Sequence, residues 1–171
     1  QVVCNEESTD AITFTTTNTD GTTSYSWTND NTSTGLAASG TGDITPFTAI
    51  NTSNSSIGST ITVTPTYINN GISCTGPSDT FTITVNRTVQ VESIASQVLC
   101  NEESTDAISF TTTNTDGTTS YSWTNDNTST GLPTGGGTGD IASFVVTNTT
   151  STAQTATLVI TPTYTNNGIS C

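Results

Sequence analysis

The chain is poor in groups that carry positive charge or exchange protons near neutral pH. Its 171 residues include no histidine and a single lysine or arginine, Arg87, against 14 acidic residues, which gives a formal net charge of −13. Basic side chains supply most of the affinity of proteins for nucleic acids, and basic clusters draw proteins to anionic lipid surfaces. We therefore expect no nucleic-acid partner and no binding to a membrane surface.

The same shortage limits the chemistry that the side chains can perform. Without histidine or lysine, carboxylates are the main candidates for a general acid or base, and a glycosidase-like pair would need two of them in one cleft. The adjacent pairs Glu6-Glu7 and Glu102-Glu103 lie in a predicted loop, where a solvated pair is the expected state. We expect that the chain is not an enzyme and holds no cofactor.

Long hydrophobic runs are also absent. No stretch approaches the roughly 18 apolar residues of a membrane span, so we expect no membrane insertion. Gln1 does not begin a signal peptide, and we interpret the chain as a mature segment. Because hydrophobic residues make up only 30% of the chain, any core will be thin and will need additional support.

What the sequence does contain is a tandem repeat. The block Gln1–Asp10 returns almost unchanged as Gln97–Asp106, and after a one-residue insertion the correspondence continues until Cys74 matches Cys171. A period of this length is too long for a solenoid unit and suits an independently folding domain. We predict a first module over residues 1–87, an extended linker over 88–96 and a second module over 97–171.

Alternation of apolar and polar residues indicates strands in each module. In Ile61–Tyr67 and Phe81–Val85 every second residue is apolar or aromatic and the residues between are polar, which is typical of a half-buried strand. Similar patterns occur at Val2-Val3, Ala11–Thr17, Ser24–Thr28 and Phe47–Asn51, and no segment has helical spacing. About six or seven short strands per module predict an all-β fold of two tandem β-sandwich modules.

The aromatic residues on the inward phase of these strands are the predicted core. Each one in the first module has a counterpart in the second, which is how core positions are expected to behave. A sugar-stacking platform is the alternative interpretation of the same cluster. The predicted core aromatics are Phe14, Tyr25, Trp27, Phe47, Tyr67, Phe110, Tyr121, Trp123, Phe144 and Tyr164.

Four cysteines offer the additional support. Cys4 and Cys74 lie near the two ends of the first module, and Cys100 and Cys171 occupy the same places in the second. We expect the disulfides Cys4–Cys74 and Cys100–Cys171, each stabilising its module by roughly 4 kcal/mol in the chain-entropy model. Four free thiols are the alternative, whereas zinc is excluded by the lack of closely spaced ligands. Disulfides would place the protein outside the cell.

Clusters of asparagine and aspartate in predicted turns raise the question of calcium. Asn18–Gly21, Asn29–Asn31 and Gly42-Asp43 supply the hard oxygen ligands that Ca²⁺ prefers. The alternating acidic pattern of a calcium loop fails, because Thr16 stands where an aspartate is required, and these residues also favour turns for conformational reasons. We expect structural turns and no metal, with calcium or glycan binding at this loop end as the alternative.

The second module ends without a partner for the segment Thr75–Asn86, which supplies the last strand of the first module. Two explanations stay open. The chain is a window from a longer repeat array, or a neighbouring subunit donates the strand to an open sheet edge.

The order of motifs resembles a known family. The segments Cys4-Asn5-Glu6, Tyr25–Asp30, Gly35–Ile44 and Thr80–Asn86 are similar to the PKD-like repeats in giant surface adhesins of Bacteroidota bacteria, including those used in gliding. The resemblance implies an immunoglobulin-like sandwich, a stalk role in a secreted surface protein, frequent export by type IX secretion, and no catalysis.

These observations together predict a structural stalk segment of an extracellular adhesin or filament. Its expected partners are further copies of the same module in cis. The alternatives are a glycan- or calcium-binding adhesive module and a filament subunit completed by strand exchange between identical chains.

Overall fold

The computed structural model describes residues 1–171, which divide into two compact units. The first comprises Gln1–Thr88 together with Asn166–Ile169 and Cys171, and the second comprises Val89–Thr165 and Ser170. These ranges differ from the predicted modules in two respects. From Val89 onward, the segment predicted as a linker belongs to the second unit. Asn166–Ile169 and Cys171, at the end of the second repeat, belong to the first unit.

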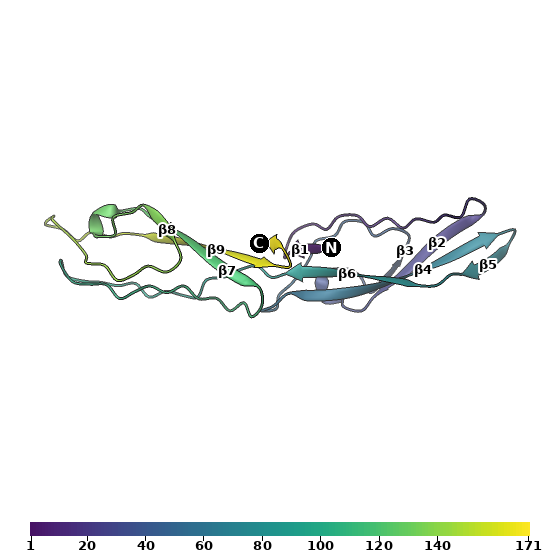
Figure 1. The fold of residues 1–171 in the computed structure, drawn as a ribbon, viewed down its shortest axis with the longest axis horizontal. Helices are drawn as coiled ribbons and strands as arrows, with labels where there is room; N and C mark the ends of the chain where they lie inside the picture. Colours follow the sequence, from purple (N-terminus) through teal and green to yellow (C-terminus); the bar gives the residue numbers. More distant parts are fainter. The chain divides into compact units, whose positions relative to one another are not determined.

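The first unit is built on one six-stranded sheet (Figure 1). Its neighbours follow the order β1-β6-β4-β2-β3, with β5 paired to β4, and only the β1–β6 pair is parallel. The strands are β1 Val2–Cys4, β2 Thr22–Asn29, β3 Ser39–Thr41, β4 Ile57–Asn69, β5 Ile72–Thr75 and β6 Asp79–Asn86, and a 3₁₀ turn, η1, covers Thr32–Thr34.

The second unit contains a four-stranded sheet in the order β10-β9-β7-β8. It lacks strands that match β1 and β6. Its elements are β7 Thr118–Asn125, the 3₁₀ turn η2 Thr128–Thr130, β8 Gly136–Thr138, β9 Leu158–Asn166 and β10 Ile169–Ser170. The prediction of an all-β fold without long helices is confirmed, and no helix has the length and hydropathy needed to span a membrane.

The longest strand, β4, is central to the first unit because β2 pairs along one edge and β6 and β5 share the other. It turns into β5 through Asn70 and Gly71, which have φ values of 50° and 78°. Positive φ at both central residues belongs to the two-residue hairpin turn that matches strand twist, and Asn-Gly is the preferred pair. The same turn returns at Asn167 and Gly168 between β9 and β10.

The predicted strands at Ala11–Thr17 and Phe47–Asn51 are wrong. Each region contains one isolated bridge, Ile12 with Ile44 and Thr48 with Ser8, and a few backbone hydrogen bonds, but no continuous strand. The Phe14 N–H donates to the Asp43 carboxylate at 2.9 Å, so a side chain replaces the next backbone partner and the ladder stops. These segments do not form a second sheet.

The core of the first unit lies between its sheet and the segments that contain Ile12, Phe14 and Phe47. Trp27, Ile61, Val63 and Ile83 from the sheet pack with Leu36 and Ile44, and four of the predicted aromatics contribute to this cluster. A glycine in β3, Gly40, permits the packing of Trp27, since a Cβ there would overlap the indole ring. The aromatics in or against this cluster are Phe14, Tyr25, Trp27 and Phe47, together with Phe81.

The second unit repeats this arrangement around Phe110, Trp123, Leu132 and Ile141. Tyr121 and Phe144 pack against that cluster. Val91, from the predicted linker, also packs there, and the Glu92 N–H donates to the Thr111 carbonyl at 2.8 Å. Tyr67 and Tyr164 lie outside both clusters, Tyr67 half-buried and Tyr164 fully buried.

Candidate functional site: the cysteine joint

The disulfide pairing differs from the prediction. Cys4 is bonded to Cys171, with 5.7 Å between their Cα atoms, while Cys74 and Cys100 are exposed free thiols. The predicted bonds Cys4–Cys74 and Cys100–Cys171 are therefore wrong. The single bond joins the start of the first repeat to the end of the second, and the two ends of the chain lie close together (Figure 1).

Strand geometry explains why Cys4 cannot reach Cys74. Cys4 lies opposite Asn86 at the end of β6 where Val85 pairs with Ile57, whereas Cys74 lies opposite Tyr67 near the other end of β4. At about 3.3 Å per residue, the stretch from Ile57 to Tyr67 spans about 33 Å. A disulfide requires Cα atoms within about 7 Å of each other.

The backbone around Cys4 is held by its own loop and by β6. The Cys4 N–H donates to the Glu7 carboxylate at 3.3 Å, and the Asn5 N–H donates to the Asn86 carbonyl at 2.8 Å. The Asn5 side chain in turn accepts the Asn51 N–H at 2.6 Å. Cys4, which is bonded to Cys171, is only 6% exposed.

Asn86 is the polar centre of the same region. It is completely buried, and its side-chain amide donates to the Asn166 carbonyl at 3.0 Å. The Asn166 side-chain amide then donates to the Ser56 hydroxyl at 3.0 Å. We call the set Cys4, Ser56, Asn86, Asn166 and Cys171 the cysteine joint. Each of these hydrogen bonds contributes about 1 kcal/mol to the stability of the folded state, in addition to the contribution of the disulfide.

The acidic pairs considered as catalytic candidates have structural positions. Glu7 and Glu103 each accept the backbone N–H of the nearby cysteine, Cys4 and Cys100 respectively. Glu6 and Glu102 both adopt a φ of 68°, which places them at the left-handed residue of the loop. Loop formation accounts for both residues of each pair.

The candidate calcium and glycan loops also use their polar atoms internally. Asn29 donates to the carbonyls of Asn31 and Leu36, Asp30 accepts the Thr60 N–H at 2.7 Å, and Asn31 caps η1 by accepting the Ser33 N–H. No group of three or more histidine, cysteine, aspartate or glutamate side chains is arranged to hold a metal ion. These contacts favour the interpretation of the motif as a structural turn.

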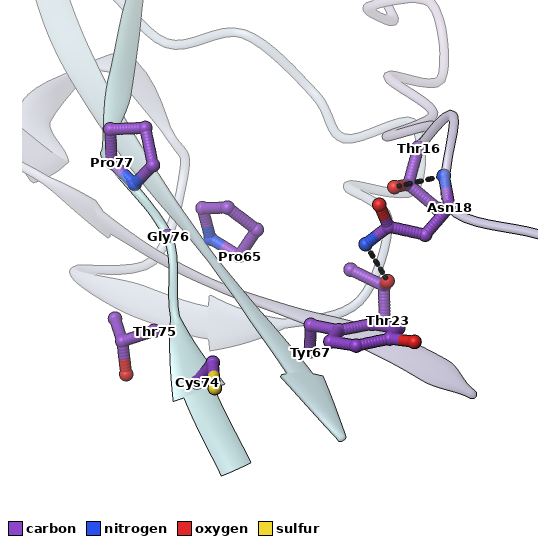
Figure 2. A pocket seen from close by; sticks show the side chains of 9 residues that line it. All are labelled: Thr16, Asn18, Thr23, Pro65, Tyr67, Cys74, Thr75, Gly76 and Pro77. Atoms are coloured by element: carbon purple, nitrogen blue, oxygen red, sulfur yellow. Dashed lines mark hydrogen bonds between the residues drawn. The ribbon is translucent and has the colours of Figure 1, made fainter. Parts of the chain in front are cut away.

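A shallow groove of about 260 Å³ lies beside the free thiol of the first unit. Figure 2 shows Cys74 and Tyr67 on neighbouring strands, with Pro65 further along and Thr23 and Asn18 at the far side. The Tyr67 hydroxyl donates to the Asp20 carboxylate at 3.0 Å. Burial, followed by this hydrogen bond, raises the pKa of Tyr67 above its ordinary value.

Comparison with protein-family models, with curated proteins and with solved structures finds no match to this chain. Sequence reasoning found the four cysteines but not their pairing, and it missed Ser56, Asn86 and Asn166. The only sequence signal for this site was the recurrence of Asn-Asn-Gly before the second cysteine of each repeat.

Proposed function

We propose that the chain is a non-catalytic structural repeat segment of an extracellular stalk, such as that of a cell-surface adhesin. The observation that carries this proposal is the Cys4–Cys171 bond, which links the first repeat to the end of the second. Disulfides of this kind persist mainly outside the cytosol, which supports an extracellular location. The resemblance to PKD-like repeats supports the same role, with each unit taken as an immunoglobulin-like sandwich.

The position of the bond suits a chain that must stay connected. It encloses a sequence separation of 167 residues, so a single backbone cut anywhere between Cys4 and Cys171 leaves both fragments joined. Arg87, the only site for a trypsin-like protease, lies inside this interval. Closing so long a loop stabilises the folded state by about 5 kcal/mol in the chain-entropy model.

Mechanical load would take a short path through this molecule. A force applied to the two termini passes from Gln1 to Cys4, across the disulfide, and out at Cys171, without unfolding either unit. A single-molecule pulling experiment on the oxidised chain, with handles at both termini, should show almost no extension. After reduction, unfolding should release a contour length of about 550–600 Å, from 167 residues at 3.3–3.6 Å each.

The variant Cys171→Ser should extend fully without reductant, whereas Cys74→Ser should behave like the oxidised parent chain. Full extension of the oxidised parent chain would contradict the proposal. Specific binding in a glycan array, or a calcium site found by calorimetry, would instead favour the adhesive-module alternative.

A filament subunit completed by strand exchange is the second candidate, and one observation favours it. In the first unit β6 pairs with one edge of β4, and the matching edge of β9 has no such strand. A peptide matching Thr75–Asn86 should bind this edge and raise the melting temperature of the second unit. Each kcal/mol of binding should add about 4–8 °C, and a scrambled peptide is the control. No shift would count against strand exchange.

A further inference from the structure

The two free thiols occupy the same repeat positions as the two bonded ones. Cys100 corresponds to Cys4, and Cys74 corresponds to Cys171. The existing bond thus connects the first cysteine of one repeat with the second cysteine of the repeat that follows. Applied again, the same relation pairs Cys100 with the second cysteine of a following repeat, and Cys74 with the first cysteine of a preceding repeat.

The loop that follows Cys100 makes two of the hydrogen bonds that the loop after Cys4 makes. The Cys100 N–H donates to Glu103 at 2.7 Å, as the Cys4 N–H does to Glu7. Asn101 accepts the Asn148 N–H at 2.6 Å, the same distance as between Asn5 and Asn51. A reactive group on a preformed loop loses less conformational entropy when it is joined to a partner.

The hairpin that carries Cys74 is equally preformed. Its turn residues have the same φ values as those of the bonded hairpin, 50° for the asparagine and 78° for the glycine. What differs is the exposure. Ile72 is 68% exposed, whereas its counterpart Ile169 is 37% exposed. The isoleucine next to the turn is therefore more covered where the adjoining cysteine is bonded.

The tyrosine opposite this cysteine lies beside open space. Tyr67 is half-buried and lines the groove of Figure 2. Burying an exposed isoleucine and the groove around Tyr67 supplies favourable apolar contact. The Cys74 hairpin therefore has the surface of an unoccupied half of a cysteine joint.

We propose that Cys74 of one chain forms a disulfide with Cys100 of a second copy of this chain. The two surfaces are different, so the contact is head-to-tail and leaves one free thiol at each end of the product. Such a contact repeats without closing on itself and generates linear covalent oligomers unless the rotation between copies closes a ring. The inference rests on the proposed stalk function and deepens it by naming the partner and the bond.

The bond forms by exchange with a small-molecule disulfide such as oxidised glutathione. The Cys74 thiol loses its proton to solvent, and the thiolate attacks the glutathione disulfide, releasing one reduced glutathione. The Cys100 thiolate of the second chain then attacks the Cys74 sulfur of this mixed disulfide and releases the second glutathione. Two protein thiols are oxidised, and one glutathione disulfide is reduced to two thiols.

The Cys100 surface holds fewer contacts than the Cys4 surface. Ala153 replaces Ser56, and no counterpart of Asn86 exists in the second unit. Val98, in the segment that matches β1, is 96% exposed. The non-covalent part of the interaction is therefore weaker, and covalent capture in a glutathione buffer is the appropriate measurement.

The experiment mixes two variants of the full chain, each with Cys4–Cys171 intact. Cys74→Ser retains only the Cys100 thiol, and Cys100→Ser retains only the Cys74 thiol. Both substitutions fall on exposed side chains, so both variants should fold. In glutathione buffer, the mixture should form a covalent heterodimer and nothing longer, while the parent chain should form a ladder of oligomers on a non-reducing gel.

If the Cys74 surface binds the Cys100 surface specifically, the mixture should yield more covalent dimer than either variant alone. The expected excess is about tenfold or more, which is the ratio given by ~1.4 kcal/mol of contact free energy. Peptide mass spectrometry should identify Cys74–Cys100 as the linkage, and the double variant Cys74→Ser/Cys100→Ser should stay monomeric.

Three results would overturn the inference. They are equal yields of Cys74–Cys74 and Cys100–Cys100 homodimers, a Cys74–Cys100 bond within one chain, and glutathione adducts without any dimer. None of these results affects extension of the single oxidised chain under force, so failure of the inference and failure of the stalk function are distinguishable.

Discussion

Val2–Cys4 and Val98–Cys100 are nearly the same three residues, yet only the first forms a strand. Val2–Cys4 is β1 and pairs in parallel with Thr84–Asn86 of β6. The second unit contains no β6 counterpart, and Val98 is 96% exposed. The comparison shows that a short segment becomes a strand when a partner satisfies its backbone, because local preference alone contributes too little.

The two Asn-Asn-Gly hairpins show the complementary case. Their turns have the same φ values, which the sequence determines locally, but one hairpin carries a bonded cysteine and the other a free one. Local sequence therefore sets the shape of each hairpin, and its surroundings set the pairing. Substitutions at matched positions of the two repeats test how much each difference contributes.

Removal of the cysteine joint should have the largest effect. The double variant Cys4→Ser/Cys171→Ser should lower the free energy of unfolding of the first unit by about 2–5 kcal/mol, because the unfolded chain regains the entropy of the open loop. Each unit contains one tryptophan, so urea denaturation followed by Trp27 fluorescence in a Trp123→Phe background isolates the first unit. Cys74→Ser/Cys100→Ser is the matched control, with an expected change within about 0.5 kcal/mol. Equal losses in both variants would show that the joint is not a stabilising element.

Core truncation should cost more in the complete sheet than in the shorter one. Ile61 is fully buried between β2 and β6, whereas its counterpart Leu158 lacks a β6 neighbour and is partly exposed. Ile61→Ala should destabilise the first unit by about 3–4 kcal/mol, and Leu158→Ala should destabilise the second by about 1–2 kcal/mol. The measurement is urea denaturation with the tryptophan of the unit concerned. Similar losses would indicate that the edge of β9 is as well packed as β4.

Asn51 and its counterpart Asn148 test the contribution of one hydrogen bond to β6, the strand that only the first unit contains. Asn51 donates to the carbonyls of Ser55 and Val85, each at 2.8 Å, whereas Asn148 donates only to Thr152 at 2.9 Å. Asn51→Ala should therefore cost about 1 kcal/mol more than Asn148→Ala, and it also leaves the Val85 carbonyl of β6 without this donor. Thermal unfolding of the two variants gives the difference, and a reversal of the order would contradict the assigned role of β6.

The smallest expected effect is a pH dependence of the stability of the first unit, which arises from Tyr67 opposite Cys74. The pKa of Tyr67 is raised above 10.0, first by burial and then by its hydrogen bond to Asp20. The folded state therefore binds the phenolic proton more tightly than the unfolded state does. This contribution to stability is fully present below about pH 10 and is lost as the pH rises through the folded pKa. In a Cys74→Ser background, the parent should lose more stability above about pH 10 than Tyr67→Phe. If the stability of both proteins changed with pH in the same way, Tyr67 would not be the cause of the pH dependence.

Several strands could be predicted from alternation alone. Ile61–Tyr67, Phe81–Val85 and Ser24–Thr28 lie inside β4, β6 and β2, because one face of each strand is buried and the other is polar. Ala11–Thr17 has a similar pattern but is not a strand, since the Asp43 carboxylate takes the Phe14 N–H. A side chain that competes for a backbone donor leaves no trace in the hydrophobic pattern.

The cysteine pairing could not be predicted for a different reason. In a tandem repeat, a bond within one repeat and a bond from one repeat to the next use the same residue types at equivalent positions. Which of these bonds forms depends on distances across the sheet. Cys4 and Cys74 lie near opposite ends of β4, about 33 Å apart at 3.3 Å per residue.

By itself the sequence determined the repeat, the all-β class, the hairpin turns and most of the aromatic core, because each of these follows from local spacing and residue type. Only the tertiary structure decided which cysteines meet, which of two nearly identical segments becomes a strand, and which thiols stay exposed. These outcomes depend on backbone partners and through-space distances between residues far apart in the chain, which no local pattern specifies.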